Sequence, residues 1–238
     1  MTERKFAVFD IDGTLIRWQL YHAVVDRLAK QNLLGKDAGS KLRQARMHWK
    51  QREHPEAFRE YELELIAIYE EAFEHLSAQA FDRATQEIIT EYGSQTYTYT
   101  RQLITRLKDQ GYYLLAISGS HNELIEKICK QYGFDDWVGT SYERSNDRFT
   151  GNKSVASHNK KAVLGRLIEK HNLSLVDSLA IGDSGSDIAM LQIVEQPIAF
   201  NPDQKLYQAA RQNGWKIVVE RKNVVYELGV KDEQYTLA

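Results

Sequence analysis

Asp10-Ile11-Asp12-Gly13-Thr14 is the most informative segment of this 238-residue chain. It follows the apolar run Phe6-Ala7-Val8-Phe9, which predicts a short buried strand that ends at a turn glycine. Two carboxylates would then lie at the carboxyl edge of the strand, where open α/β sheets bind their ligands. Because carboxylates pack poorly in an apolar core, the pair indicates a metal site or an acid–base pair.

The composition is that of a globular chain with a normal polar surface. It contains 42 % hydrophobic and 27 % charged residues, with a net charge of −2, so nothing global attracts it to nucleic acid or anionic lipid. The single Cys129 excludes an internal disulfide and a cysteine metal cluster. The chain start, residues 1–5, lacks the apolar region of a secretory signal, and no run approaches the roughly 18 apolar residues of a membrane span. We therefore expect a cytoplasmic protein with no nucleic-acid or membrane partner. The sequence does not indicate whether the protein is a monomer or an oligomer.

The rest of the chain divides by its periodicity. From about Trp18 to Tyr92, apolar residues recur every three to four positions, which predicts consecutive helices, with Pro55 in the first turn of the third. After Tyr97, predicted helices alternate with predicted strands at 112–117, 137–140, 178–181, 197–200 and, last, 216–219. Such alternation predicts an α/β fold with a doubly wound, parallel, Rossmann-like sheet. We expect a core domain of residues 1–16 and 94–238, and an all-helical cap domain, residues 17–93, inserted beside the active edge.

The predicted cap has an uneven distribution of charge. Residues 36–59 contain seven Lys or Arg and three acids, whereas residues 60–91 contain nine acids and one Arg. Two interpretations stay open: a basic lip that attracts an anionic substrate, or two solvated helix faces that attract each other.

Three further polar sites lie at predicted strand ends or helix starts. Ser118-Gly119-Ser120 follows one strand, where backbone N–H groups and a hydroxyl suit a phosphate. Asp183 follows another strand, with Asp187 four residues later, and Lys160 or Lys161 begins the helix before it. Each could be a cap, turn or surface residue when taken alone. Together with Asp10 and Asp12 they predict one site at one edge of the sheet.

This arrangement resembles the haloacid-dehalogenase superfamily of phosphatases, and within it the phosphoserine-phosphatase-like branch. The resemblance covers nearly the whole chain and includes the place of the cap between the first and second motifs. The segments Arg148-Phe149-Thr150-Gly151 and 201–206 are similar to the sequences that flank the motifs in that family. The family places its lysine four residues before a leucine, so Leu164 selects Lys160 over Lys161.

The resemblance implies a Mg²⁺-dependent phosphoric monoester hydrolase that acts on a small phosphorylated metabolite. Asp10 would be the nucleophile that forms an aspartyl-phosphate, and Asp12 the general acid and base. Asp10, Asp183 and the backbone carbonyl of Asp12 would hold Mg²⁺, with Asp187 bound directly or through water. The phosphoryl oxygens would be bound by Ser118, the Gly119 amide and Lys160.

The chain departs from phosphoserine phosphatases where the substrate is selected. Gln19 takes the place of a glutamate that meets the substrate amine, Ser186 takes the place of an asparagine, and an arginine for the substrate carboxylate cannot be placed. Trp18 and Gln19 are candidate substrate-binding residues. A phosphomutase or phosphotransferase stays open as an alternative, as does a non-catalytic phosphate-binding protein. A dehalogenase is disfavoured because that branch lacks the second aspartate.

Overall fold

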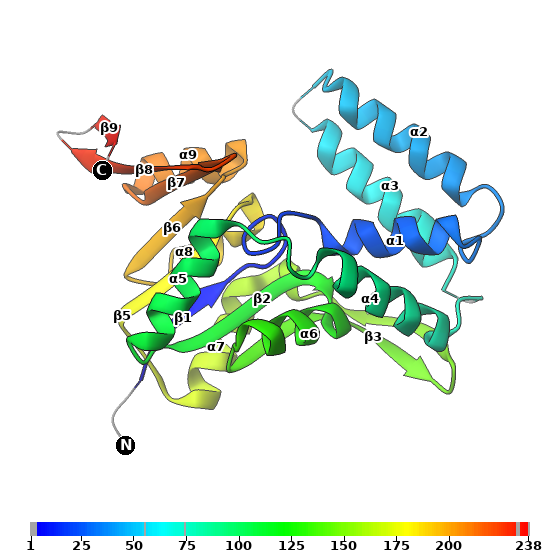
Figure 1. Ribbon diagram of the computed structural model, residues 1–238, viewed down its shortest axis with the longest axis horizontal. Helices are drawn as coiled ribbons and strands as arrows, with labels where there is room; N and C mark the ends of the chain where they lie inside the picture. The colour runs from blue at the N-terminus through cyan, green and yellow to red at the C-terminus, as the bar shows by residue number, and fades with distance from the viewer. Residues whose placement is uncertain (1–3, 55, 74, 232–233, 238) are drawn as a thin grey trace. The chain divides into compact units, whose positions relative to one another are not determined.

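The computed structural model describes residues 4–54, 56–73, 75–231 and 234–237 (Figure 1), so Pro55 and residues 1–3 lie outside the described residues. The chain forms two compact units. The first consists of Met1–Gln19, Gly93–Thr140 and Val155–Ala238, and the second of Leu20–Tyr92 and Ser141–Ser154. The sequence had predicted residues 141–154 with the sheet, whereas the structure groups them with the helices.

The strands of the described residues form one sheet in the order β4-β3-β2-β1-β5-β6-β7-β8-β9. Their bounds are β1 Arg4–Phe9, β2 Tyr113–His121, β3 Asp136–Ser145, β4 Arg148–Ser154, β5 Leu173–Gly182, β6 Gln196–Phe200, β7 Lys216–Arg221, β8 Val224–Lys231 and β9 Gln234–Leu237. Pairing is parallel from β3 to β7 and antiparallel at both ends. The chain leaves β1 toward β2 on one side and later returns to β5 on the other. The carboxyl ends of β1, β2 and β5 therefore lie next to one another, at the reversal of strand order that doubly wound sheets use for ligands.

Helices cover both faces of this sheet, as the doubly wound prediction requires. One face packs against α7 (Lys160–His171), α8 (Ile188–Leu191) and α9 (Gln204–Asn213) in a core that includes Phe6 and Val8 of β1. The alternate residues Ala7 and Phe9 are also fully buried, on the face that carries α5 (Thr98–Asp109) and α6 (Asn122–Tyr132) (Figure 1). Burial on both faces explains why β1 is a continuous apolar run rather than an alternating one. The predicted fold class is confirmed.

The second unit contains the predicted helices, together with a hairpin. The helices are α1 Leu20–Lys30, α2 Ala38–Gln51, α3 Ala57–Glu71 and α4 Ala78–Tyr92. The hairpin of residues 141–154 packs on this unit through its aromatic side chains: the Phe149 ring stacks at 5.0 Å on Phe73, which follows α3, and Tyr142 meets the same ring edge-on at 4.6 Å. Arg144 adds two hydrogen bonds to Asp82 of α4, at 2.9 and 3.1 Å. No described helix is long and apolar enough to cross a membrane.

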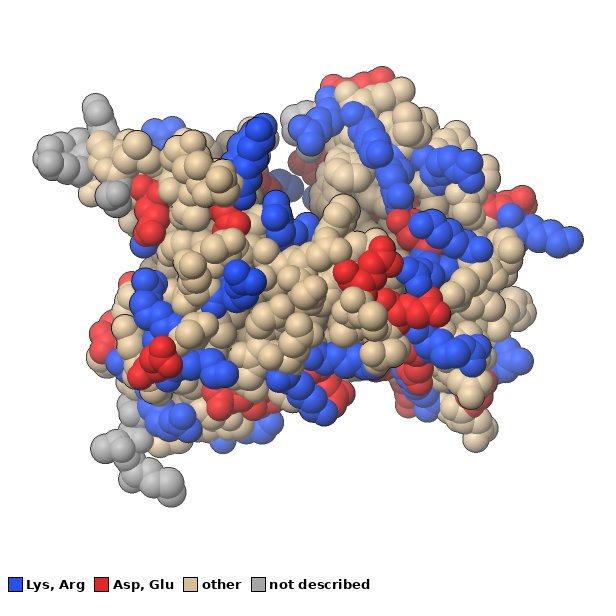
Figure 2. All heavy atoms as spheres, in the orientation of Figure 1, with Lys and Arg blue, Asp and Glu red and all other residues tan. Residues whose placement is uncertain are grey.

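Ion pairs in this unit join several acids of residues 60–91 to cations outside residues 36–59. The acids of α4 pair elsewhere: Glu87 and Glu91 with Arg27 of α1, and Asp82 with Arg144 of the hairpin. Figure 2 shows Lys and Arg side chains gathered over α2. None of the exposed cations there forms an ion pair with a described carboxylate; they are Lys36, Lys41, Arg43, Lys50 and Arg52.

Two strands follow the one that the sequence predicts to be the last. β8 and β9 extend the sheet by antiparallel pairing after a turn in which Lys222 has a φ of 57°. The signal was present as the alternation Val224, Tyr226, Leu228, and it was missed because the expectation of parallel strands requires a helix before each strand.

Candidate active site

Three neighbouring strands place the predicted site residues at one edge of the sheet. Asp10 follows β1, Ser118 lies near the end of β2, and Asp183 follows β5. The backbone N–H of Asp10 donates to the carbonyl of Ile181 at 2.9 Å, which fixes the start of the Asp10 loop against β5. Strand β2 continues to His121 and α6 begins at Asn122, so Ser118 and Gly119 lie before the helix rather than at its first turn.

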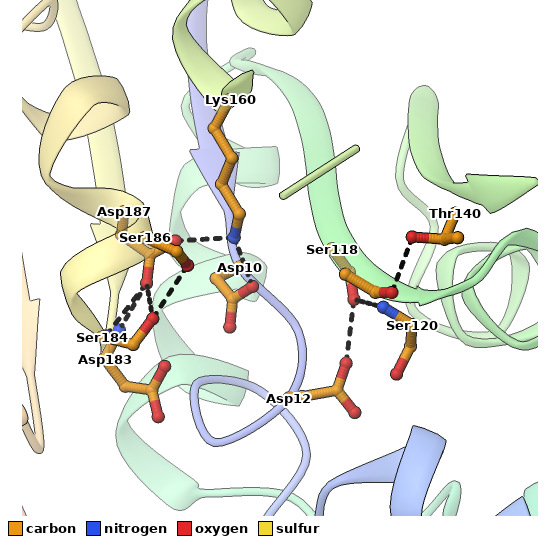
Figure 3. Close-up of polar contacts among 11 residues, drawn as sticks. Asp10, Asp12, Ser118, Ser120, Thr140, Lys160, Asp183, Ser184, Ser186 and Asp187 are labelled. Carbon is orange, nitrogen blue, oxygen red and sulfur yellow. Dashed lines mark hydrogen bonds and ion pairs between the residues drawn. The ribbon is translucent and has the colours of Figure 1, made fainter. Parts of the chain in front are cut away.

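Lys160 joins the loops after β1 and β5. Its Nζ lies 2.6 Å from Asp10 Oδ1 and 2.6 Å from Asp187 Oδ1 (Figure 3). The lysine is only 2 % exposed, although it is the first residue of α7. The helix start holds its backbone, because Asn159 caps α7 by accepting from the Ala162 N–H at 3.0 Å. The predicted lysine, and not its exposed neighbour Lys161, therefore reaches the carboxylates.

Asp187 organises the turn after β5. Its Oδ2 accepts hydrogen bonds from the N–H of Asp183 at 3.1 Å, the N–H of Ser184 at 3.0 Å and the Ser184 hydroxyl at 3.2 Å. Its Oδ1 accepts from Lys160, so both oxygens have protein donors. Gly182 leaves room for this carboxylate, because a Cβ there would lie 2.4 Å from Asp187 Cγ.

Asp12 points to the other side of Asp10, toward β2 (Figure 3). Its Oδ2 accepts a hydrogen bond from the Ser118 hydroxyl at 2.8 Å, and Ser118 Oγ in turn accepts from the Ser120 N–H at 2.9 Å. The Gly119 carbonyl accepts from the Thr140 hydroxyl at 2.7 Å, which fixes this end of β2. Asp10 is therefore flanked by a cation on one side and by a carboxylate–hydroxyl pair on the other.

Asp10, Asp183 and Asp187 form an acidic cluster that could hold a metal ion. One carboxylate oxygen from each lies within 4.8 Å of the others. Asp183 approaches the Asp10 loop so closely that a Cβ on Gly13 would lie 2.1 Å from Asp183 Oδ2. Gly13 also has a φ of 77°, in the left-handed region that favours glycine. The glycine of the first motif is thus required by both backbone conformation and space.

The clustered carboxylates hold protons more tightly than isolated ones. The pKa of Asp10 is raised from 3.8 to about 7, first by burial and then by the charges of Asp187 and Asp12, against the lowering effect of Lys160. The pKa of Asp183 is raised well above its ordinary value, first by burial and then by Asp10 and Asp187. Burial alone would lower the pKa of Lys160, but Asp10 and Asp187 outweigh it, so the pKa lies above its ordinary value. A cation between Asp10 and Asp183 would relieve this repulsion.

The two candidate substrate residues lie in different surroundings. Gln19 is half-buried, and its Nε2 lies 3.3 Å from the place of a Cβ on Gly13, so it belongs to the Asp10 loop region. Trp18 is 51 % exposed and donates from Nε1 to Gln95 Oε1 at 2.5 Å. No arginine for a substrate carboxylate could be placed from the sequence; of the arginines in residues 20–92, Arg46 already donates hydrogen bonds to Asp26 and Tyr61.

The sequence did not single out Asp203, which lies beside the Asp183 turn. Its carboxylate accepts from the Gly185 N–H at 2.9 Å, and its own N–H donates to the Asp183 carbonyl at 2.8 Å. The available signal was its place in the family-like text of residues 201–206. The sequence of residues 201–206 gave no reason to connect Asp203 with Asp183.

The doubly wound sheet thus carries a carboxylate pair, a buried lysine and a second acidic turn at the carboxyl edge of neighbouring strands. The family model of haloacid dehalogenase-like hydrolases matches residues 7–192, and the chain belongs to that family.

Curated relatives cover most of this chain. It is 26 % identical over 227 residues to a histidinol-phosphatase of Neisseria meningitidis serogroup C (strain 8013), covering 90 % of this chain and 98 % of the relative. It is 25 % identical over 211 residues to a phosphoserine phosphatase of Archaeoglobus fulgidus, covering 87 % of this chain and 56 % of that longer relative.

Solved structures share the fold. A protein of unknown function from Bordetella pertussis superposes with a TM-score of 0.72 at 19 % identity, covering 91 % of this chain and 98 % of that one. A phosphoserine phosphatase, solved as an analogue of its phospho-aspartyl intermediate, superposes with a TM-score of 0.63 at 18 % identity, covering 93 % and 96 %.

Proposed function

We propose that this chain is a phosphatase that hydrolyses small phosphomonoesters through a phosphorylated Asp10. One observation carries the proposal: the Asp10 carboxylate lies between the Lys160 ammonium, 2.6 Å from Oδ1, and the carboxylate of Asp183. Asp12 lies on the other side of Asp10, toward β2 (Figure 3). A nucleophile, a fixed cation, a metal-binding acid and a proton carrier thus meet at one strand end. The family membership and the phosphatase names of the relatives support this class of enzyme.

The donor set fits Mg²⁺. Asp10 and Asp183 offer carboxylate oxygens and the Asp12 backbone a carbonyl, which are the hard ligands that Mg²⁺ prefers. Because both oxygens of Asp187 have protein donors, we assign it to holding Lys160 and the turn rather than to direct coordination. When bound, Mg²⁺ would neutralise negative charge on the phosphoryl group and on the carboxylates.

In the first step an Asp10 carboxylate oxygen attacks phosphorus in line with the ester oxygen. The new bond joins Asp10 to phosphorus, and the ester P–O bond breaks. Asp12 gives its proton to the leaving oxygen, so an alcohol departs. Lys160 and the Ser118–Gly119 segment would hold the other phosphoryl oxygens.

In the second step water attacks the phosphorus of the aspartyl-phosphate. Asp12, now a carboxylate, takes the proton of that water, and the bond between Asp10 and phosphorus breaks. Inorganic phosphate leaves, Asp10 is a carboxylate again, and Asp12 again carries a proton. The hydrogen bond from Ser118 holds the Asp12 carboxylate in place between the two steps.

The charges of the site agree with these roles. Asp10, Asp12, Asp183 and Asp187 carry four negative charges if all are ionised, and Lys160 with Mg²⁺ returns three positive ones. The remaining charge disappears if Asp12 holds a proton, the state that a general acid needs in the first step.

The substrate is proposed only as a class. The names of the two relatives are those of phosphatases for small amine-bearing metabolites, which makes such phosphomonoesters the first candidates. Gln19 is uncharged, so it can donate to or accept from a polar substrate group but cannot form an ion pair with an ammonium.

The experiment is phosphate release from a panel of phosphomonoesters, with Mg²⁺ and with chelator. The panel comprises phosphoserine, histidinol phosphate, phosphocholine, glycerol phosphates, nucleotides and sugar phosphates. Metal-dependent release that Asp10→Asn abolishes is the expected result. A protein that binds Mg²⁺ but releases no phosphate, and instead converts a sugar 1-phosphate to its isomer, would contradict hydrolysis and identify a mutase.

A further inference from the structure

Asp203 connects the start of α9 with the turn that carries Asp183. It follows β6 and immediately precedes α9, on a segment separate from the catalytic loops. Asp203 Oδ1 accepts from the Leu206 N–H at 2.7 Å, which is an ordinary N-cap of α9. Its other oxygen is not needed for that cap.

The second oxygen of Asp203 reaches across to the turn after β5. Asp203 Oδ2 accepts from the Gly185 N–H at 2.9 Å, a contact between residues 18 positions apart. The Asp203 N–H also donates to the Asp183 carbonyl at 2.8 Å. One residue thus bonds to the backbone at two points of the turn, on either side of Ser184.

The contact leaves little freedom to the turn. A Cβ on Gly185 would lie 3.2 Å from Lys205 Cβ, so the α9 start packs directly on the glycine. On its inner side, the same turn is held by Asp187, whose Oδ2 accepts from the Asp183 and Ser184 N–H groups. Asp187 and Asp203 therefore hold the turn from two sides.

We infer that Asp203 is a positioning residue for the metal site, which acts by holding the backbone of Asp183 in the conformation that binds Mg²⁺. The inference rests on the proposed function, in which Asp183 is a metal ligand. A turn released from α9 would have to be ordered when the metal binds, and the cost of ordering would weaken the affinity. Partners outside the direct ligands commonly change metal affinity by about 10- to 100-fold.

Two substitutions separate positioning from helix capping. Asp203→Ala removes both the cap and the bond to Gly185. Asp203→Ser keeps an oxygen that can cap α9 but has no second oxygen for Gly185. Ser77→Ala is the matched control, because Ser77 Oγ accepts from the Ala80 N–H at 3.0 Å at the start of α4, in the other unit.

The test measures the Mg²⁺ dissociation constant by titration calorimetry and the melting temperature of the metal-free protein. We expect Asp203→Ser to melt close to the wild type and Asp203→Ala to melt several degrees lower, at about 2–4 °C per kcal/mol for a chain of this size. Both should bind Mg²⁺ about tenfold more weakly. Ser77→Ala should lower the melting temperature and leave the dissociation constant unchanged.

Three results would overturn the inference. If Asp203→Ser bound Mg²⁺ as tightly as the wild type, Asp203 would be only a helix cap. If Ser77→Ala weakened Mg²⁺ binding as much as the Asp203 variants do, the weaker binding would follow from lower stability in general. If the wild type itself bound no Mg²⁺, the metal site of the proposed function would fail, and Asp203 would have nothing to position. The first two leave the proposed function intact.

Discussion

Lys160 Nζ lies 2.6 Å from Asp10 Oδ1, at a sequence separation of 150 residues, and the same ammonium bonds to Asp187. All three groups are almost fully buried. Two carboxylates and one ammonium leave a net negative charge in a water-poor place, which is favourable only if each group keeps its partner. The site is therefore a source of both reactivity and instability.

Lys160→Met should destabilise the protein as well as inactivate it. Removing the ammonium leaves Asp10 and Asp187 buried without their cation, a change that commonly costs about 3–5 kcal/mol. The loss should be smaller at acidic pH, because the raised pKa of Asp10 lets that carboxyl group become protonated there. Urea unfolding at two pH values measures it. Lys161→Met, at the exposed neighbouring position, is the control and should change stability by less than about 0.5 kcal/mol. Equal effects of the two substitutions would contradict the structural role of Lys160.

Gly13→Ala should weaken the metal site. The new Cβ would occupy a point 2.1 Å from Asp183 Oδ2, and alanine resists the φ of 77° at this position. We expect the Mg²⁺ affinity, measured by calorimetry, to fall at least about tenfold. Gly39→Ala is the matched control, because a Cβ there meets nothing within 4 Å and α2 should gain up to about 1 kcal/mol. If Gly13→Ala bound Mg²⁺ as tightly as the wild type, Asp183 would not be a ligand of the metal.

Mg²⁺ should stabilise the protein more at alkaline than at acidic pH. In the metal-free fold the pKa of Asp10 is raised to about 7, from 3.8, so between these values the folded state binds more protons than the unfolded state. The free energy of unfolding of the metal-free protein therefore falls as the pH rises through this range. Mg²⁺ must displace those protons, so its apparent affinity should rise by about tenfold per pH unit for each proton displaced.

Melting temperatures with Mg²⁺ and with chelator, at about pH 5.5 and about pH 8, test this linkage. At each pH, the melting temperature with chelator is subtracted from that with Mg²⁺, so that the titration of groups outside the site cancels. A larger stabilisation by Mg²⁺ at the lower pH would contradict the placement of the metal on Asp10 and Asp183.

The sequence was sufficient to predict that these polar residues lie at strand ends, but not which contacts hold them together. Asp10, Ser118 and Asp183 could be placed because an apolar run followed by a polar turn marks a strand end. The double contact of Lys160 depends on where α7 begins over the sheet, which no local pattern encodes. Tyr142 and Phe149 were assigned to the sheet domain for the same reason: an alternating hairpin does not reveal which surface it packs on. Here that surface is formed by the rings of Phe73, which follows α3, and of Phe81 in α4.

Gln19→Glu should shift the choice of substrate toward amines. A carboxylate beside the Asp10 loop would attract an ammonium group, so the ratio of kcat/KM for phosphoserine to that for glycerol phosphate should rise, by about 2- to 5-fold for about 0.5–1 kcal/mol of attraction. Steady-state kinetics on both substrates provide the ratio. An unchanged ratio would count against Gln19 as a selecting residue, while the chemistry at Asp10 would be unaffected.

The central claim is that Asp10 becomes phosphorylated. The most direct measurement mixes the protein with Mg²⁺ and a phosphoester that it hydrolyses, quenches the mixture in acid, and reduces acyl phosphates with borohydride before peptide mass spectrometry. The account predicts that residue 10 appears as homoserine, only when both metal and substrate are present, and not in Asp10→Asn. Phosphate release without any modification at residue 10, or with modification at another carboxylate, would contradict it.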